Sequence, residues 1–197
     1  SLKQNMGKGF AVKTGVSYSD GDYILFTDAD GSTPIEELDE FKVFLNNSYS
    51  GILIGKRKIK EEAGNRLILI TRRLARYTYK RIRMLLFLKN IEDTQCGFKI
   101  FSSDLKDYFI ALQRQYRYSF DIELLSITKL LKKDIKEVSI NWIYKPGSKI
   151  NIVKDSLKMF YELFKIKIAF ISGSYRLDKV DSLKKIELAK IKSIIVD

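Results

Sequence analysis

Residues 23–34 read YILFTDADGSTP, and this stretch decides how the rest of the chain is interpreted. Its first part, Tyr23–Thr27, is β-branched and aromatic and is bounded by turn-forming residues, which predicts a buried strand. Asp28 and Asp30 follow at the carboxyl edge of the expected sheet, where open α/β folds bind ligands. Two carboxylates this close repel each other unless a positive charge lies between them, and a divalent cation with substrate phosphates would supply it. The plainer interpretations are a solvated turn or a helix cap at Asp30.

The composition limits the classes of function. The 197 residues suffice for one domain with a real core, and 36 basic against 24 acidic residues give a formal charge of +12. Such an excess implies an anionic partner, either nucleic acid, a phospholipid surface or a phosphorylated substrate. The chain contains no histidine, which excludes imidazole bases, Ser-His-Asp triads and histidine-ligated zinc. No apolar stretch reaches the roughly 18 residues of a membrane-spanning helix, so we expect none.

A glycine-rich turn precedes the acidic stretch. Gly7, Lys8 and Gly9 stand directly before a helical pattern of apolar residues. Backbone N–H groups at a helix N-terminus, together with the lysine charge, can cradle a phosphate group. A flexible turn that caps the helix is the plainer interpretation, because two glycines and a lysine are a weak motif.

Positive charge follows the next predicted strand. Gly51–Gly55 is a short apolar run, and Lys56–Lys58 would bring cations to the same sheet edge as the aspartates. Residues 64–90 combine an apolar row with an opposing arginine-rich row, which predicts a long amphipathic helix. Such a helix can lie in a membrane interface and attract anionic headgroups, or pack on the core with a solvated charged face. Nucleic acid is disfavoured here, because aromatic residues are not interleaved with the basic ones.

Later segments add polar residues between regular elements. Residues 93–101 begin as a polar turn and become a strand, in which Gly97 suggests a close backbone approach. Asp93 could serve as a base, as an acceptor for a substrate hydroxyl or as a turn former. Asp121 and Glu123 stand at the start of a helix, where they would cap it and compensate its dipole. Helices are also expected at 104–112 and 155–171, a strand at 135–144, and a basic turn at 145–149 that could close over phosphates.

Several of these segments together resemble family 2 glycosyltransferases, most closely the branch of dolichyl-phosphate β-glucosyltransferases and other polyprenyl-phosphate hexosyltransferases. The matching motifs occur in order and cover residues 5 to about 168. They are NMGKG at 5–9, GDYILFTDADGSTP at 21–34, DTQCGFK at 93–99, FDIELL at 120–125 and GSK at 147–149. The acidic motif and the DTQCGFK motif are specific, whereas the glycine-lysine turn is not.

The resemblance implies a fold and an activity. The fold would be an α/β domain of the GT-A type, a mostly parallel sheet flanked by helices and truncated at its N-terminus. The activity would be the inverting transfer of a hexose, expected to be glucose from UDP-glucose, onto a dolichyl-type polyprenyl phosphate at the membrane surface. The enzyme would be membrane-associated on the cytoplasmic face, at the endoplasmic reticulum in a eukaryote or the plasma membrane in a prokaryote. No nucleic-acid partner is expected.

The resemblance also assigns residues of this chain to the donor and the metal. Asp28, Asp30 and Ser32 would bind Mg²⁺ or Mn²⁺ in the manner of a DXD motif. Lys8 and Lys149 would join Asp28 and Asp30 around the donor diphosphate, with Lys149 on a loop that closes over it. The metal would neutralise the charge that builds up on the leaving diphosphate.

The acceptor is assigned in the same way. Arg57 and Arg72, helped by Arg76, would hold the acceptor phosphate. Asp30 and Asp93 would be the catalytic residues, with Asp93 positioning the substrate instead of accepting a proton. A lipid phosphate is already ionised at neutral pH, so a general base is dispensable in a chain without histidine.

We expect a partial GT-A domain over residues 1–175, including the basic helical segment, and a charged helical tail over 176–197. Relatives begin with a strand and loop that grip the uracil and ribose. Nothing precedes Ser1 to supply them, so the N-terminal part of the domain is expected to be missing. Two alternatives remain. One is a family 2 transferase with a soluble or polysaccharide acceptor, and the other is a non-catalytic basic module that binds membranes or nucleic acid.

Overall fold

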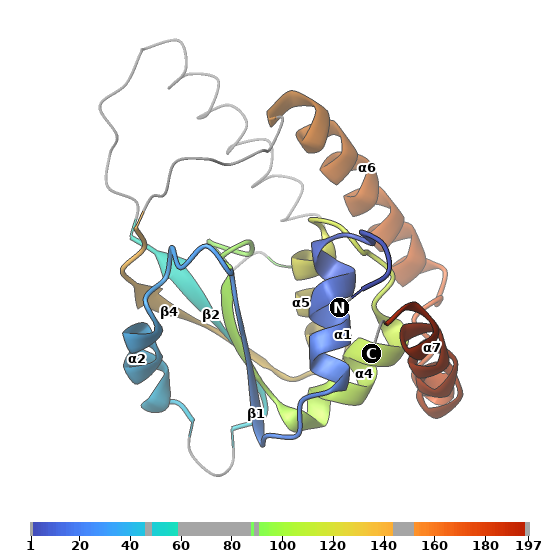
Figure 1. Ribbon diagram of the computed structural model, residues 1–197, viewed down its shortest axis with the longest axis horizontal. Coiled ribbons are helices and arrows are strands. Elements are labelled where there is room, and N and C mark those ends of the chain that lie inside the picture. The colour runs from blue at the N-terminus through green and yellow to red at the C-terminus, as the bar shows by residue number, and fades with distance from the viewer. Residues whose placement is uncertain (1, 46–48, 59–87, 89–90, 144–151, 196–197) are drawn as a thin grey trace.

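Four strands of the described chain pair into one sheet in the computed structural model (Figure 1). They are β1 (Tyr23–Thr27), β2 (Gly51–Arg57), β3 (Phe98–Ser102) and β4 (Asp134–Ile140), in the order β1-β3-β2-β4. β3 runs antiparallel to β1 and β2, and β4 runs parallel to β2. β1, β2 and β4 therefore point the same way, and their carboxyl ends share one edge. The structure describes residues 2–45, 49–58, 88, 91–143 and 152–195.

The position of β1 corrects one expectation about burial. Only Ile24 of β1 is buried, whereas the sequence predicts a buried strand. β1 has one neighbour among the described strands, while β3 has two and is buried along its whole length. β1 is therefore buried only at Ile24, and its other side chains stay partly or largely accessible.

Helices flank the sheet on both sides, which confirms the predicted α/β class. In Figure 1, α2 (Leu38–Lys42) lies on one side, and α1 (Lys8–Ser17), α4 (Lys106–Leu112) and α5 (Phe120–Leu130) lie on the other. Beyond these run α6 (Ile152–Ile171) and α7 (Val180–Ile194), and short 3-10 turns cover Ile35–Glu37, Ser103–Leu105 and Leu177–Lys179. No helix of the described residues is long and apolar enough to span a bilayer.

Aromatic pairs fill both faces of the sheet. Phe98 of β3 packs against Phe41 of α2, with ring centroids 5.2 Å apart. On the opposite face, Phe101 packs against Phe109 of α4, at 4.8 Å. Because successive strand residues point to opposite faces, β3 contributes to both halves of the core. Truncating a buried phenylalanine of this kind to alanine costs about 3–5 kcal/mol.

The last described residues pack on the body of the domain. α7 packs against α4, with Val180 and Ile191 buried. The two ends of the described chain also meet, because Leu2 and Ile195 form an isolated antiparallel bridge. The Lys3 backbone N–H donates to the Ile194 carbonyl at 2.9 Å. The division of the chain after residue 175 stays a prediction.

Candidate active site at the carboxyl edge of the sheet

The acidic pair lies where β1 ends. The Asp28 backbone N–H donates to the Gly97 carbonyl at 2.8 Å, which extends the β1–β3 pairing by one bond. The Asp30 carboxylate accepts from the Ser32 backbone N–H at 2.8 Å and so fixes the turn that follows. Gly31 lies between them at a φ of 63°, a conformation that favours glycine. Both aspartates are thus anchored through the backbone at the edge where the sequence places them.

Lys8 contacts the first aspartate directly. Its Nζ lies 2.5 Å from Asp28 Oδ1, and both side chains are about one-third exposed. The Lys8 ammonium also lies 5.8 Å from the centroid of the Phe120 ring. The cation predicted to hold donor phosphate and the carboxylate predicted to hold metal therefore neutralise each other in this structure.

Gly97 makes this corner possible. A Cβ atom at residue 97 would lie 2.0 Å from Asp28 Oδ2, so a side chain there would displace the carboxylate. The close backbone approach predicted for Gly97 is confirmed, and the partner is the Asp28 carboxylate. Next to it, Cys96 is fully buried.

A second charged cluster follows β2. The Arg57 guanidinium donates to both oxygens of Asp93, at 2.6 and 2.8 Å, and lies 5.4 Å from the Trp142 ring centroid. The Asp93 backbone N–H donates to Glu137 of β4 at 2.6 Å. Burial opposes the Arg57 charge, but hydrogen bonds and charge from Asp93 outweigh it and raise the pKa of the guanidinium. Two residues predicted for separate tasks therefore form one bidentate ion pair.

The two charged clusters are connected through one short segment of the backbone. Residues 93–97 connect the Arg57 pair to β3, and Gly97 in turn binds Asp28. The negative charge of Asp28 is also among the causes that raise the pKa of Arg57.

A buried ion pair joins β3 to α5 near this edge of the sheet. Lys99 of β3 and Asp121 of α5 are both buried and contact each other through Nζ and Oδ1. Lys99 Nζ also donates to the Cys96 carbonyl at 2.6 Å. Burial raises the pKa of Asp121, while Lys99 and Lys8 act against that rise. A charge inside the apolar run of residues 98–101 was the sequence signal for this pair, because a buried lysine needs a carboxylate.

Asp121 and Glu123 have partners outside their helix, which the expectation of capping did not foresee. Both carboxylates are buried. Glu123 Oε2 accepts from the backbone N–H groups of Arg114 and Gln115, at 2.9 and 2.7 Å, and its Oε1 accepts from the Tyr175 hydroxyl at 2.6 Å. Burial raises the pKa of Glu123, and these hydrogen bonds act in the opposite direction. Glu123 thereby fixes the loop after α4.

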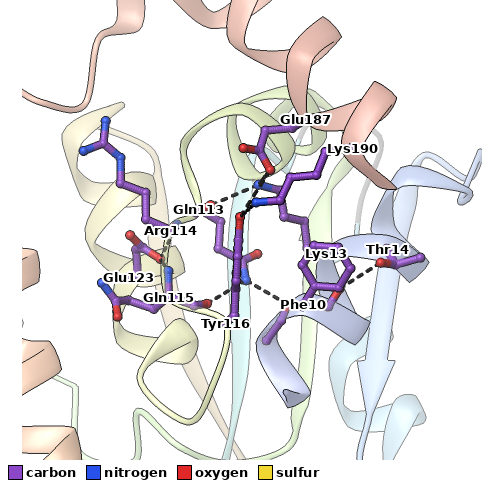
Figure 2. A network of polar contacts seen from close by, with 11 residues as sticks. Phe10, Lys13, Thr14, Gln113, Arg114, Gln115, Tyr116, Glu123, Glu187 and Lys190 are labelled. Carbon is purple, nitrogen blue, oxygen red and sulfur yellow. Dashed lines mark hydrogen bonds and ion pairs between the residues drawn. The ribbon is translucent and has the colours of Figure 1, made fainter. Parts of the chain in front are cut away.

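That loop holds the first turn of α1 (Figure 2). The Tyr116 carbonyl accepts from the Phe10 N–H at 3.2 Å, and the Gln113 side chain donates to the Gly9 carbonyl at 2.8 Å. Cβ atoms at Gly7 and Gly9 would come within 2.4 Å and 2.7 Å of carbonyl oxygens in this loop. The glycines next to Lys8 are therefore required by close packing, which the sequence motif alone does not reveal.

α7 completes the same network. Buried Lys13 donates to Glu187 of α7 at 2.6 Å and to the Gln113 carbonyl at 3.0 Å, and Lys190 donates to the Tyr116 hydroxyl at 2.7 Å. Figure 2 shows these side chains converging between α1, the loop and α7. Burial lowers the pKa of Lys13, while Glu187 acts to raise it. The helix that carries Lys8 is thus fastened to the C-terminal helix.

The donor set for a metal is small. The described residues contain no group of three or more histidine, cysteine, aspartate or glutamate side chains placed to hold an ion. Asp28 and Asp30 alone suit Mg²⁺ or Mn²⁺ only if water and substrate phosphates complete the coordination, which is the usual arrangement for Mg²⁺. Ser32 is buried, and its backbone N–H is already bound to Asp30.

Several predicted site residues lie outside the described residues. They are Lys149, Arg72 and Arg76, and with them nearly all of the basic segment 64–90, of which Leu88 alone is described. Their assignments stay predictions.

The chain is similar in sequence to proteins of known family. The profile of the family described as "Glycosyl transferase family 2" matches residues 1–109. Human dolichyl-phosphate beta-glucosyltransferase is 32% identical over 91% of this chain and 57% of its own length. The protein of that name from Saccharomyces cerevisiae is 30% identical over 90% of this chain and 57% of its own length. The chain thus spans little more than half the length of these relatives.

Solved structures share the fold. Glucosyl-3-phosphoglycerate synthase from Mycobacterium tuberculosis, in complex with Mn²⁺, UDP-glucose and phosphoglyceric acid, matches with a TM-score of 0.57 and 18% identity. The match covers 81% of this chain and 54% of that one. Mannosyl-3-phosphoglycerate synthase from Rubrobacter xylanophilus matches with a TM-score of 0.58 and 17% identity, over 87% of this chain and 53% of that one. The predicted GT-A fold is confirmed, with a mixed sheet in which β3 runs against its neighbours.

Proposed function

The chain belongs to glycosyltransferase family 2, and we propose that it acts in the inverting transfer of glucose from UDP-glucose to a dolichyl-type polyprenyl phosphate. The observation that carries this proposal is its similarity, over about nine-tenths of its length, to dolichyl-phosphate beta-glucosyltransferases from several organisms. The charge layout of the site supports it, because the carboxylate pair follows β1 and Arg57, paired with Asp93, ends β2 at the same edge of the sheet.

The proposed donor half of the site comprises Asp28, Asp30 and Lys8. A divalent ion on the two carboxylates would neutralise charge on the leaving diphosphate when it is bound. Lys8 would exchange its ion pair with Asp28 for the diphosphate, which leaves the Asp28 oxygen open to the metal. A fold neighbour crystallised with Mn²⁺ and UDP-glucose is in keeping with this assignment.

The proposed acceptor half is centred on Arg57. Its guanidinium can direct donors toward a phosphate while Asp93 fixes its orientation through two hydrogen bonds. An oxygen of the lipid phosphate would attack the anomeric carbon as the bond from that carbon to the diphosphate oxygen breaks. UDP leaves with the electron pair, the configuration at the anomeric carbon inverts, and no proton needs to move. Positioning of the two phosphates then supplies the catalysis.

A transfer assay tests this function. The protein is incubated with radiolabelled UDP-glucose, Mn²⁺ and dolichyl phosphate solubilised in detergent, and label in the lipid fraction is counted. We expect labelled lipid, and about a hundredfold slower turnover for Asp30→Asn, because one charge that supports the leaving diphosphate is lost. The absence of labelled lipid with either dolichyl or undecaprenyl phosphate would overturn the proposal. Label on a soluble saccharide instead would favour the alternative acceptor class.

A further inference from the structure

α6 exposes an apolar row along its outer face. Tyr161, Phe164, Ile168 and Ile171 are 63%, 59%, 64% and 73% exposed. They follow one another at steps of three and four residues, which places them on one side of a helix. Single exposed apolar residues are ordinary, but a continuous row of four on one helix marks a surface that binds something.

The other side of α6 is occupied by the core. Leu163 and Ile166 are buried, and the Phe170 ring lies 4.4 Å from that of Tyr175. The helix therefore has two apolar faces, one toward the domain and one toward its surroundings. The inner contacts already hold α6 in place, so the fold does not require the outer row.

Lysines flank the outer row. Lys158 and Lys165 lie on one side of it and Lys167 on the other, as the helical repeat of about 3.6 residues requires. The Lys165 ammonium lies 4.5 Å from the centroid of the Tyr161 ring, so the lysine stem runs beside the row. Lysines that border an apolar helix face can extend their ammonium groups to anionic headgroups while the face enters the acyl boundary.

We propose that α6 docks the protein on an anionic lipid surface through Tyr161, Phe164, Ile168 and Ile171. The bordering lysines and the formal charge of +12 match a negatively charged bilayer and would disfavour close pairing of two copies. In Figure 1, α6 runs along the outside of the molecule, beyond α1 and α5. The proposal deepens the proposed function, because it names the surface by which the enzyme would reach a membrane-embedded acceptor.

A matched pair of variants tests this docking surface. Ile168 on α6 and Ile186 on α7 are 64% and 62% exposed, and either change to aspartate alters the net charge equally. Binding is measured by co-sedimentation with vesicles of equal parts phosphatidylcholine and phosphatidylglycerol. We expect Ile168→Asp to weaken binding about tenfold or more, because a large apolar side chain no longer enters the bilayer. Ile186→Asp should bind as the wild type does, and vesicles of phosphatidylcholine alone should bind less of every protein.

Two outcomes would overturn the inference. One is equal vesicle binding by both variants. The other is a wild-type dimer in sedimentation velocity that Ile168→Asp converts to a monomer without a change in vesicle binding, because the row would then cover a second copy. Circular dichroism verifies that both variants are folded.

The transfer assay separates this inference from the proposed function. With acceptor solubilised in detergent, Ile168→Asp should transfer glucose as the wild type does, since the docking surface is not needed there. Selective loss of vesicle binding with no transfer by any protein would sink the proposed function and leave α6 as the docking helix. Glucose transfer without any effect of Ile168→Asp on vesicle binding would overturn the docking role of α6 and leave the proposed function standing.

Discussion

Lys8 and Asp28 form an ion pair, with 2.5 Å between Nζ and Oδ1, although one is proposed to bind the donor diphosphate and the other the metal. Lys8 therefore occupies the carboxylate that the metal would need, and Asp28 occupies the ammonium group that the diphosphate would need. Donor and metal must open this pair together, so their binding should be coupled.

Lys8→Gln should uncouple the two ligands. UDP affinity in the presence of Mn²⁺ should fall about tenfold, because a charged hydrogen bond to phosphate is lost. Mn²⁺ alone should bind at least as tightly as to the wild type, because no lysine then competes for Asp28. Isothermal titration calorimetry measures both. Weaker binding of Mn²⁺ alone to the variant would contradict the expectation that Lys8 competes with the metal for Asp28.

Gly97→Ala should separate activity from stability. The new Cβ would meet the end of the Asp28 side chain at 2.0 Å, and this carboxylate can swing away without unfolding the strand. Transfer should fall about a hundredfold, while the melting temperature changes little. The matched control is Gly15→Ala in α1, where a Cβ meets nothing within 4 Å. That change should leave transfer intact and raise stability by about 0.5–1 kcal/mol. Full activity of Gly97→Ala would remove Asp28 from the site.

Arg57→Lys tests the acceptor half. Lysine keeps the charge but cannot make the two parallel bonds to Asp93 at 2.6 and 2.8 Å. The KM for the lipid phosphate should rise about tenfold, with the KM for UDP-glucose unchanged. Lys58→Gln, at an exposed cation one residue along, serves as the control. A rise in the KM for UDP-glucose alone would place Arg57 with the donor instead.

Cys96 should be unreactive in the folded protein. Burial raises the pKa of its thiol from 9.0 to about 11, so little thiolate exists at pH 8. Alkylation by iodoacetamide, followed by mass spectrometry, should be about a hundredfold slower than in denaturant. Comparable rates in the two states would show that the thiol is accessible.

The raised pKa of the Cys96 thiol also makes the stability of the fold depend on pH. The unfolded thiol ionises from 9.0 and the folded one only near 11, so the folded state binds more protons between these values. Cys96 therefore makes its full contribution to the free energy of unfolding below pH 9, and this contribution is lost as the pH rises toward 11. Denaturant titrations of Cys96→Ala and the wild type across this window measure it. A larger decline in the variant would contradict the sign.

The sequence predicts individual strands better than it predicts which strands pair with one another. The runs at 23–27, 51–55 and 98–101 become strands because apolar periodicity is local information. The order β1-β3-β2-β4 is not local, since β3 enters between two strands that precede it in the chain. For the same reason, the position of β1 at the edge of the described strands, and thus its partial exposure, could not be anticipated.

The candidate site shows the same division. Asp28 and Asp30 could be placed at a strand end from the motif alone, and the structure puts them there. That Arg57 would pair with Asp93 depends on how residues 93–97 return beside β2, which spacing does not encode. Glu123 was expected as a helix-end charge, but its partners belong to a loop that becomes its neighbour only in the folded chain.

The bridge between Leu2 and Ile195 also has a mechanical consequence. A force that pulls the two ends apart acts first on this single bridge and on the neighbouring contact between Lys3 and Ile194. The next load falls on α7, which a tether at its end would peel from α4 one contact at a time. The paired strands carry that force last. Pulled apart at Leu2 and Ile195, the described chain should lose this bridge and the packing of α7 first and the sheet last.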